Sequence, residues 1–201
     1  MKRIDWSHPA PRRGLAGARD QLTGPGPEPA ELRLQFGSAA VAAVAAGLWY
    51  RHAGNGSLLL LAFAVVMAFD IAGGVVTNAT STAKRWFHRE GQGFREHVCF
   101  EALHLLHILV LALLFAEGDW ILFGALSTAL IASTVVILVS PLYLKRPVAM
   151  ALYGAVVVVL PAIVSAPAGM EWFIPLFYLK LLIGHLLPEE PYRPTVEPAN
   201  G

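Results

Sequence analysis

"EHVCFEALHLLHILVLALLF", residues 96–115, begins with several glutamate and histidine side chains and continues as an unbroken apolar run. Its length matches the ~20 apolar residues that an α-helix needs to cross a hydrocarbon core ~30 Å thick. Ionisable groups within such a helix cost free energy unless they pair or face the interior of a helix bundle. The stretch therefore predicts a membrane-spanning helix with a polar face turned toward other helices.

The composition of the whole chain also indicates a membrane protein. Its 201 residues are 56% hydrophobic and only 14% charged, against roughly 25% charged residues in soluble domains. Apolar segments lie near 34–50, 57–77, 98–116, 120–142, 147–165 and 170–187. We therefore predict an all-α integral membrane protein, with a six-transmembrane-helix bundle over residues 34–188 as its single domain.

The charged residues predict the orientation of the bundle. Lys and Arg are concentrated before residue 34 and in the loops 78–97 and 143–146, whereas the opposite loops carry Arg51. Since Lys- and Arg-rich loops remain in the cytoplasm, we predict a multi-pass protein of the inner (plasma) membrane with both termini cytoplasmic. Residues 1–33, rich in Pro and Gly, are predicted to be a disordered cytoplasmic tail, and 189–201 a short C-terminal tail.

The sequence argues against nucleic acid as a partner and against sites that need several cysteines. Basic residues form no stripe with interleaved aromatic side chains, so nucleic acid is not an expected partner. Cys99 is the single cysteine, which excludes an internal disulfide and any metal site built from several cysteines. The lipid bilayer is the expected partner, and a homo-oligomer stays open.

Polar residues of different predicted spans lie at a similar depth. At 1.5 Å per residue, His104 lies about 10 Å inside the predicted cytoplasmic end of its span. Asp70 and Lys180 lie at about the same depth in theirs. Because opposite charges at this depth are cheapest when they meet, we predict a structural ion pair between Asp70 and Lys180.

Helical phase groups three residues of the opening stretch. At 100° per residue, His97, Glu101 and His104 share one face of the helix, while His107 diverges from it. We expect these three side chains to line an interior cavity together with Asp70, and His107 to take a separate role, such as a bond to a neighbouring helix.

A metal site is one interpretation of this group. Glu101-x-x-His104 has the i, i+3 spacing of bundle carboxylate metal sites, and His97 adds a ligand on the same face. With Asp70, His88 or His185 completing the shell, and His185 the ligand we select, this set could hold a divalent metal such as zinc or iron. The motif occurs once, whereas di-iron bundles use two copies.

The same region supports chemistry without a metal. Carboxylate and imidazole groups in a pocket of low dielectric can exchange protons, so Glu101, His104 and Asp70 are the catalytic candidates, and no cofactor-binding residue is predicted. Their depth favours binding of, or action on, a membrane-soluble amphiphile or lipid. A small-solute or proton-coupled transporter, or a structural or partner-binding membrane protein without catalytic activity, are the alternatives.

Overall fold

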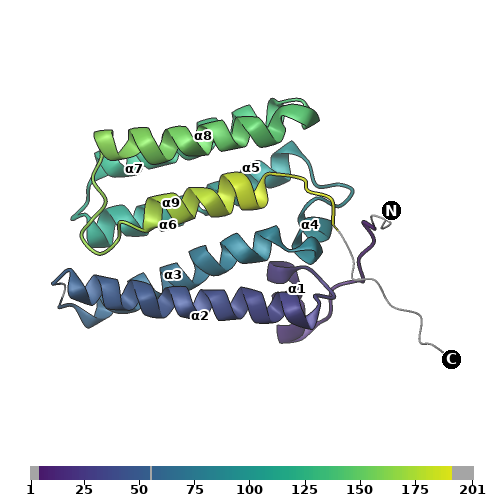
Figure 1. Cartoon of the computed structure of the whole chain (residues 1–201), viewed down its shortest axis with the longest axis horizontal. Helices are drawn as coiled ribbons and strands as arrows, with labels where there is room; N and C mark the ends of the chain where they lie inside the picture. The colour runs from purple at the N-terminus through teal and green to yellow at the C-terminus, as the bar shows by residue number, and fades with distance from the viewer. Residues whose placement is uncertain (1–4, 55, 192–201) are drawn as a thin grey trace.

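The computed structural model describes residues 5–54 and 56–191, and this part of the chain is helical, with no strand. Figure 1 shows the helices side by side in a bundle. In chain order they are α1 (Gly14–Thr23), α2 (Pro29–His52), α3 (Leu58–Ala79), α4 (Ser81–Phe87), α5 (Phe94–Leu103), α6 (Leu105–Val110), the π-helix η1 (Leu111–Phe115), α7 (Trp120–Val139), α8 (Leu142–Ile163), α9 (Phe173–Tyr178) and the π-helix η2 (Leu179–His185). The predicted all-α class is confirmed.

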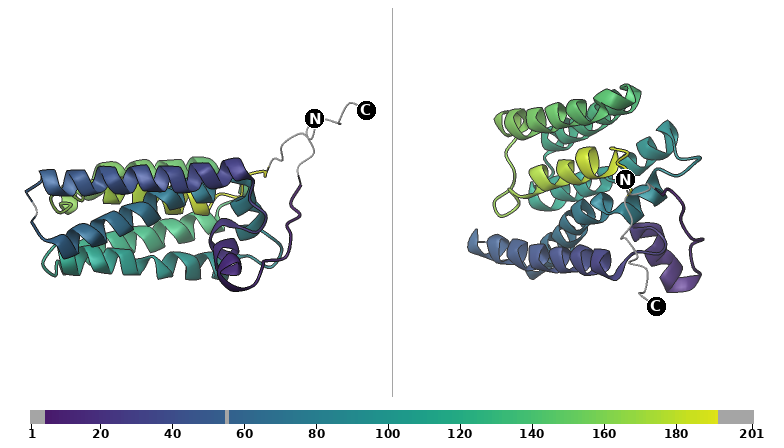
Figure 2. Two further views of the ribbon diagram at one scale, coloured as in Figure 1. Left: turned by 90° about the horizontal axis from the view of Figure 1, so that it is seen from below. Right: turned by 45° about the vertical axis from the view of Figure 1, so that its right-hand side comes forward.

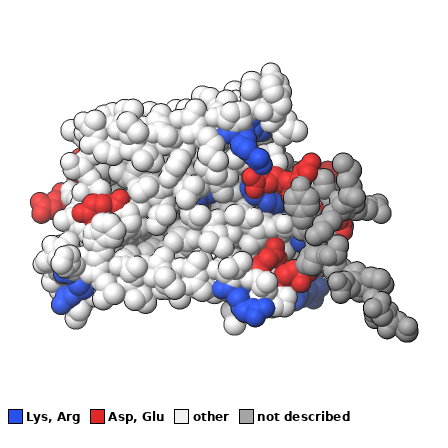
Figure 3. Space-filling model, in the orientation of Figure 1, with Lys and Arg blue, Asp and Glu red and all other residues white. Residues whose placement is uncertain are grey.

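Within the described residues, five helical segments are long and apolar enough to cross a membrane. They are α2, α3, the continuous segment Phe94–Phe115, α7 and α8. On the face shown in Figure 3, charged side chains gather at the two ends of the bundle and leave the surface between them nearly free of charge. Because a charged side chain in hydrocarbon costs at least ~2.5 kcal/mol, such a surface suits a bilayer. These features indicate a multi-pass membrane protein.

The sixth predicted span is shorter than expected. The apolar helix Phe173–His185 joins the six residues of α9 to the seven of η2, so at 1.5 Å per residue it falls short of a ~30 Å hydrocarbon core. Residues 164–172 precede it without regular helix, and Gly169 has a φ of 84°. The six-span count is therefore not confirmed, and the structure has five long helices and one short central one. Figures 1 and 2 show α9 between the α7–α8 and α2–α3 pairs.

The N-terminal segment differs from the disordered tail that its composition predicts for residues 1–33. Residues 14–23 form α1, and α2 already begins at Pro29. Asp20 is 1% exposed and accepts hydrogen bonds from Arg12 Nε at 2.9 Å and Arg12 Nη2 at 2.5 Å. These bonds lower the pKa of Asp20 to about 2. A specific ion pair thus orders a segment whose polar composition alone predicts disorder.

The folded N-terminal segment and the start of α2 are fastened to Thr82 in α4. The Glu31 carboxylate accepts hydrogen bonds from Thr82 N at 3.1 Å and Thr82 Oγ1 at 2.6 Å. At Gly24, where φ is 79°, an added Cβ would lie 2.6 Å from the Thr82 carbonyl oxygen, so only glycine fits there. These contacts hold α1 against the end of the bundle where α4 lies. At the other terminus, residues 192–201 of the predicted C-terminal tail lie outside the described residues.

Candidate functional site

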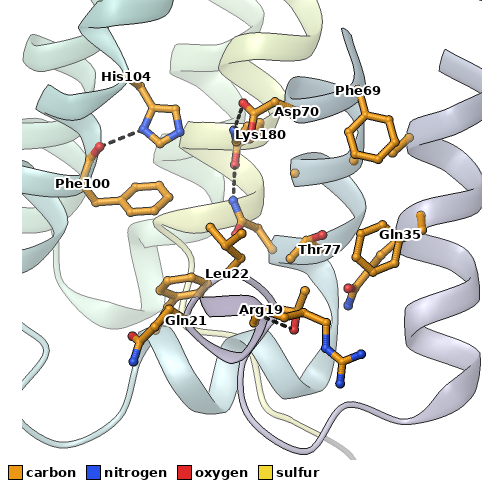
Figure 4. Close-up of a pocket in the computed structure, with 17 residues that line it drawn as sticks. Arg19, Gln21, Leu22, Gln35, Phe69, Asp70, Thr77, Phe100, His104 and Lys180 are labelled. Atoms are coloured by element: carbon orange, nitrogen blue, oxygen red, sulfur yellow. Dashed lines mark hydrogen bonds and ion pairs between the residues drawn. The ribbon is translucent and has the colours of Figure 1, made fainter. Parts of the chain in front are cut away.

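A pocket of about 380 Å³ lies between α5 on one side and α2 and α3 on the other, with η2 behind it and α1 at one end. Figure 4 shows its lining. Leu22, Phe36 and Phe69 belong to this lining although they are 71%, 47% and 41% exposed. Phe87 and Phe100 add aromatic surface from α4 and α5. The wall of the pocket is therefore mainly apolar, and its exposed rim is apolar as well.

An ion pair lies at the end of the pocket farther from α1, which we call the deeper end because it lies farther inside the bundle. Lys180 Nζ donates to Asp70 Oδ2 at 2.7 Å, and His107 Nε2 lies 2.9 Å from the same oxygen. The Lys180 side chain is 5% exposed and that of Asp70 is 50% exposed, so the carboxylate reaches the pocket while the ammonium group lies behind it. The two residues that the sequence pairs thus make contact. His107 adds a bond to the neighbouring helix α3.

Gly74 makes room for this ion pair. A Cβ added at Gly74 would lie 2.4 Å from Lys180 Cε and 3.0 Å from Lys180 Nζ. Any side chain at this position would displace the lysine. Gly74 in α3 therefore lets η2 approach closely enough for Lys180 to meet Asp70, one turn earlier on the same helix, whereas the neighbouring Gly73 faces Ala39 of α2.

The helices that carry the site are irregular at the site itself. Lys180 lies in the π-helix η2, and His104 lies between α5 and α6, where its N–H bonds to the Glu101 carbonyl three residues back. Single-turn π segments inside helices occur frequently at functional sites. His104 Nδ1 lies 2.8 Å from the Phe100 carbonyl oxygen, so Nδ1 carries the proton and Nε2 is the basic nitrogen of the neutral ring. Figure 4 shows His104 facing Asp70 and Lys180.

Glu101 is enclosed behind the site. It is 0% exposed, and within the described residues neither carboxyl oxygen has a hydrogen-bond partner. Lys180 is the charged group that acts electrostatically on it. Glu101 is absent from the lining of the pocket, so the cavity expected for His97, Glu101, His104 and Asp70 receives His104 and Asp70. An unpaired buried carboxyl group opposes stability, which makes Glu101 a functional candidate.

His97 and His185 belong to a second group of side chains near α4. His97 Nδ1 lies 3.1 Å from His185 Nε2, and His88 Nε2 lies 2.9 Å from the His185 carbonyl oxygen. His97 and His185 line a separate cavity of about 160 Å³. Burial, with neighbouring His97 and Lys84, lowers the pKa of His88 to about 3, so this imidazole is neutral at neutral pH.

The predicted metal ligands do not converge. In residues 5–54 and 56–191, no group of three or more His, Cys, Asp or Glu side chains is arranged to hold a metal ion. His97 and His185 contact each other, His104 bonds to the Phe100 carbonyl, and Glu101 is enclosed near Lys180. The structure therefore gives no support to a zinc or iron site, because the break at His104 redirects one half of the Glu-x-x-His motif.

Sequence reasoning missed two parts of the site, although it expected for His107 the kind of bond to a neighbouring helix that His107 makes with Asp70 of α3. It omitted Arg19 because the N-terminal segment was expected to be disordered, and it did not single out Gln35, the one amide in the Ala-rich first span. The spacing of Arg12 and Asp20, eight residues apart with opposite charge, was the available signal for a folded N-terminal segment.

Comparison with known proteins adds no relative. No protein-family model, curated protein or solved structure matches the chain at a significant level, so the functional conclusion rests on the site itself.

Proposed function

We propose that the protein binds a membrane-soluble amphiphile in the pocket between α3 and α5 and transfers protons to or from its polar group. The observation that carries this proposal is the pocket itself. It has about 380 Å³, an exposed apolar rim, and Asp70 and Lys180 at its deeper end. Pockets for small molecules are typically ~300–1,000 Å³, mainly apolar, with a few polar groups that fix orientation.

The polar end has the groups that proton transfer requires. Asp70 is held by Lys180 and His107, and His104 presents its basic nitrogen toward the pocket while Phe100 fixes the ring. His104 would serve as the general base, and the Asp70 carboxylate would orient the polar group of the amphiphile. Glu101, enclosed next to Lys180, would supply or accept a proton behind them. A metal has no role in this proposal.

The distribution of Lys and Arg residues indicates the leaflet from which the amphiphile enters. The pocket lies toward the end of the bundle that carries α1, α4 and the Lys- and Arg-rich loops. The positive-inside rule assigns such loops to the cytoplasm. The proposed amphiphile therefore reaches the site from the cytoplasmic leaflet of the inner membrane.

A proton-coupled transporter is the second candidate. Asp70, His107 and Lys180 form a connected polar group beside the buried Glu101. Chains of acidic residues and histidines within the membrane are the usual proton relays of pumps and transporters. The enclosed Glu101, without a hydrogen-bond partner among the described residues, favours this candidate. If the protein neither binds an amphiphile nor moves protons, a structural or partner-binding role remains.

The test is to purify the protein in a mild detergent, extract it with organic solvent and identify bound amphiphiles by mass spectrometry. Thr77→Phe would fill the pocket, since Thr77 lines it. Val66→Phe is the matched control, because Val66 lies on the same helix, is 64% exposed and is absent from the lining. We expect a stoichiometric amphiphile with the unmodified protein and with Val66→Phe, and its loss with Thr77→Phe. Equal retention by both variants would refute the pocket as the binding site.

A further inference from the structure

The pocket has a second polar end, near α1, which the proposed function does not use. Gln35 is 2% exposed, and its Nε2 lies 3.4 Å from Thr80 Oγ1. That hydroxyl donates to the Thr77 carbonyl at 2.7 Å, so it can only accept from Gln35. The amide must therefore turn its NH₂ group to Thr80. This leaves Gln35 Oε1 as a buried acceptor without a hydrogen-bond partner among the described residues.

Arg19 supplies a donor at the same end. Within the described residues, its Nε is buried and has no hydrogen-bond partner. The adjacent carboxylate, Asp20, is already held by Arg12 through two side-chain bonds. Figure 4 shows Arg19 and Gln35 on the same side of the pocket, on the far side of Thr77 from Asp70. The lining of one pocket thus contains the Arg19 guanidinium and the Gln35 Oε1 acceptor, each with a buried polar atom that has no hydrogen-bond partner among the described residues.

This end is distinct from the ion pair. Asp70 and Thr77 are seven residues apart on α3, which separates them by about 10 Å along the helix. Lys180 is neutralised by Asp70 at 2.7 Å, so Arg19 is the cation left to attract an anion. Guanidinium groups bind phosphate and carboxylate oxygens with two parallel hydrogen bonds.

We propose that the ligand is an anionic amphiphile, whose phosphate or carboxylate binds Arg19 while a hydroxyl or amine of its head group donates to Gln35 Oε1. The tail lies along the apolar rim formed by Leu22, Phe36 and Phe69. This inference rests on the binding part of the proposed function and names the ligand class of that pocket. It also assigns a role to α1, which carries Arg19 and is therefore part of the binding site.

Three probes separate the contributions to binding. A single-chain glycerol phosphate has the tail, the hydroxyl and the anion; a single-chain glycerol ether of equal tail length lacks the anion; inorganic phosphate lacks the tail. Binding of radiolabelled probe to the full-length protein in neutral detergent micelles gives the three affinities. We expect the glycerol phosphate to bind at least about tenfold more tightly than the glycerol ether, the loss typical of one charge-assisted hydrogen bond. Inorganic phosphate should bind far more weakly than either.

Two variants with the same charge change test the assignment to Arg19. Arg19→Gln should abolish the preference for the glycerol phosphate. Arg13→Gln, at the exposed start of the same helix and outside the pocket lining, should retain it. Gln35→Leu should weaken binding of both single-chain probes, since each carries a hydroxyl. Equal behaviour of the two arginine variants, or no preference in the unmodified protein, would overturn the inference.

The outcomes also distinguish this inference from the proposed function. If both single-chain probes bind equally and Thr77→Phe blocks both, the pocket binds amphiphiles but does not select an anion. If neither probe binds, the proposed function itself fails. If inorganic phosphate binds as tightly as the glycerol phosphate, the site recognises a free anion and the amphiphile assignment is wrong.

Discussion

Lys180 Nζ and Asp70 Oδ2 lie 2.7 Å apart, although 110 positions separate the two residues in the chain. The pair joins the short central helix to α3 and neutralises two charges within the apolar part of the bundle. Since an isolated charge at this depth would cost at least ~2.5 kcal/mol, the pair accounts for both residues in a chain otherwise poor in charge.

The first prediction concerns the energy of this pair. Asp70→Asn and Lys180→Met should each destabilise the protein by about 1.5–3 kcal/mol, the range for hydrogen bonds to charged groups. The double variant should lose less than the sum of the two. Unfolding in detergent titrations measures the three losses, and strict additivity would contradict an interaction between the residues.

The second prediction concerns the space that Gly74 provides. Gly74→Ala should push Lys180 away from Asp70, because the new Cβ would lie 2.4 Å from Lys180 Cε; we expect a loss of about 1–3 kcal/mol. Gly124→Ala in α7 is the control, since no atom lies within 4 Å of its added Cβ. That variant should be neutral or slightly stabilising. Equal melting temperatures of the two variants would argue against close packing at Gly74.

The third prediction concerns the enclosed carboxyl group. Glu101→Leu should stabilise the protein, because the change removes two buried oxygens that lack hydrogen-bond partners among the described residues. Burial of such a polar group typically costs about 1–3 kcal/mol. Thermal unfolding in detergent measures the change, with Glu90→Leu in the exposed loop between α4 and α5 as control. A destabilised Glu101→Leu protein would mean that the carboxyl group has a stabilising partner.

The fourth prediction concerns the pH dependence of α1. Because Arg12 lowers the pKa of Asp20 to about 2 from its usual 3.8, the ion pair contributes stability at pH values above 3.8. This contribution is lost as the pH falls through about 2. Hydrogen exchange of α1 amides, corrected for intrinsic rates, should therefore accelerate between these values, while α7 amides serve as internal reference. In Asp20→Asn, α1 should exchange rapidly throughout, and an unchanged α1 would contradict the role of the pair.

The fifth prediction concerns topology. The loop after α4, with Arg89, and the start of α8, with Arg146, lie at one end of the bundle. The end of α2, with Arg51, and the loops before α7 and after α8, with Asp119 and Ala168, lie at the other. Reporter fusions at the first two positions should indicate the cytoplasm, and fusions at the other three the opposite side. A cytoplasmic signal at Ala168 would show that α8 does not complete a crossing. A non-cytoplasmic signal from a fusion at Arg193 would show that the short helix Phe173–His185 does not complete one.

The sequence by itself determined the membrane class, the five long helices and the residues at the deeper end of the pocket. Hydropathy and length suffice for the helices, because the bilayer imposes one thickness and one solvent on every span. The cost of charge at depth also sufficed to pair Asp70 with Lys180. Each of these conclusions depends on a physical constraint that acts along a single helix or between opposite charges.

Tertiary structure alone decided the rest. Ordering of α1 depends on the Arg12–Asp20 ion pair and on the close approach of Gly24 to Thr82 of α4, neither of which amino-acid composition reveals. The shortened central helix and the break at His104 are departures from regular helix, so extrapolation at 100° per residue placed His97 and Glu101 in a cavity that they do not line. A pocket is the space left between helices after packing. Its shape and its two polar ends therefore depend on how side chains from six helices fit together.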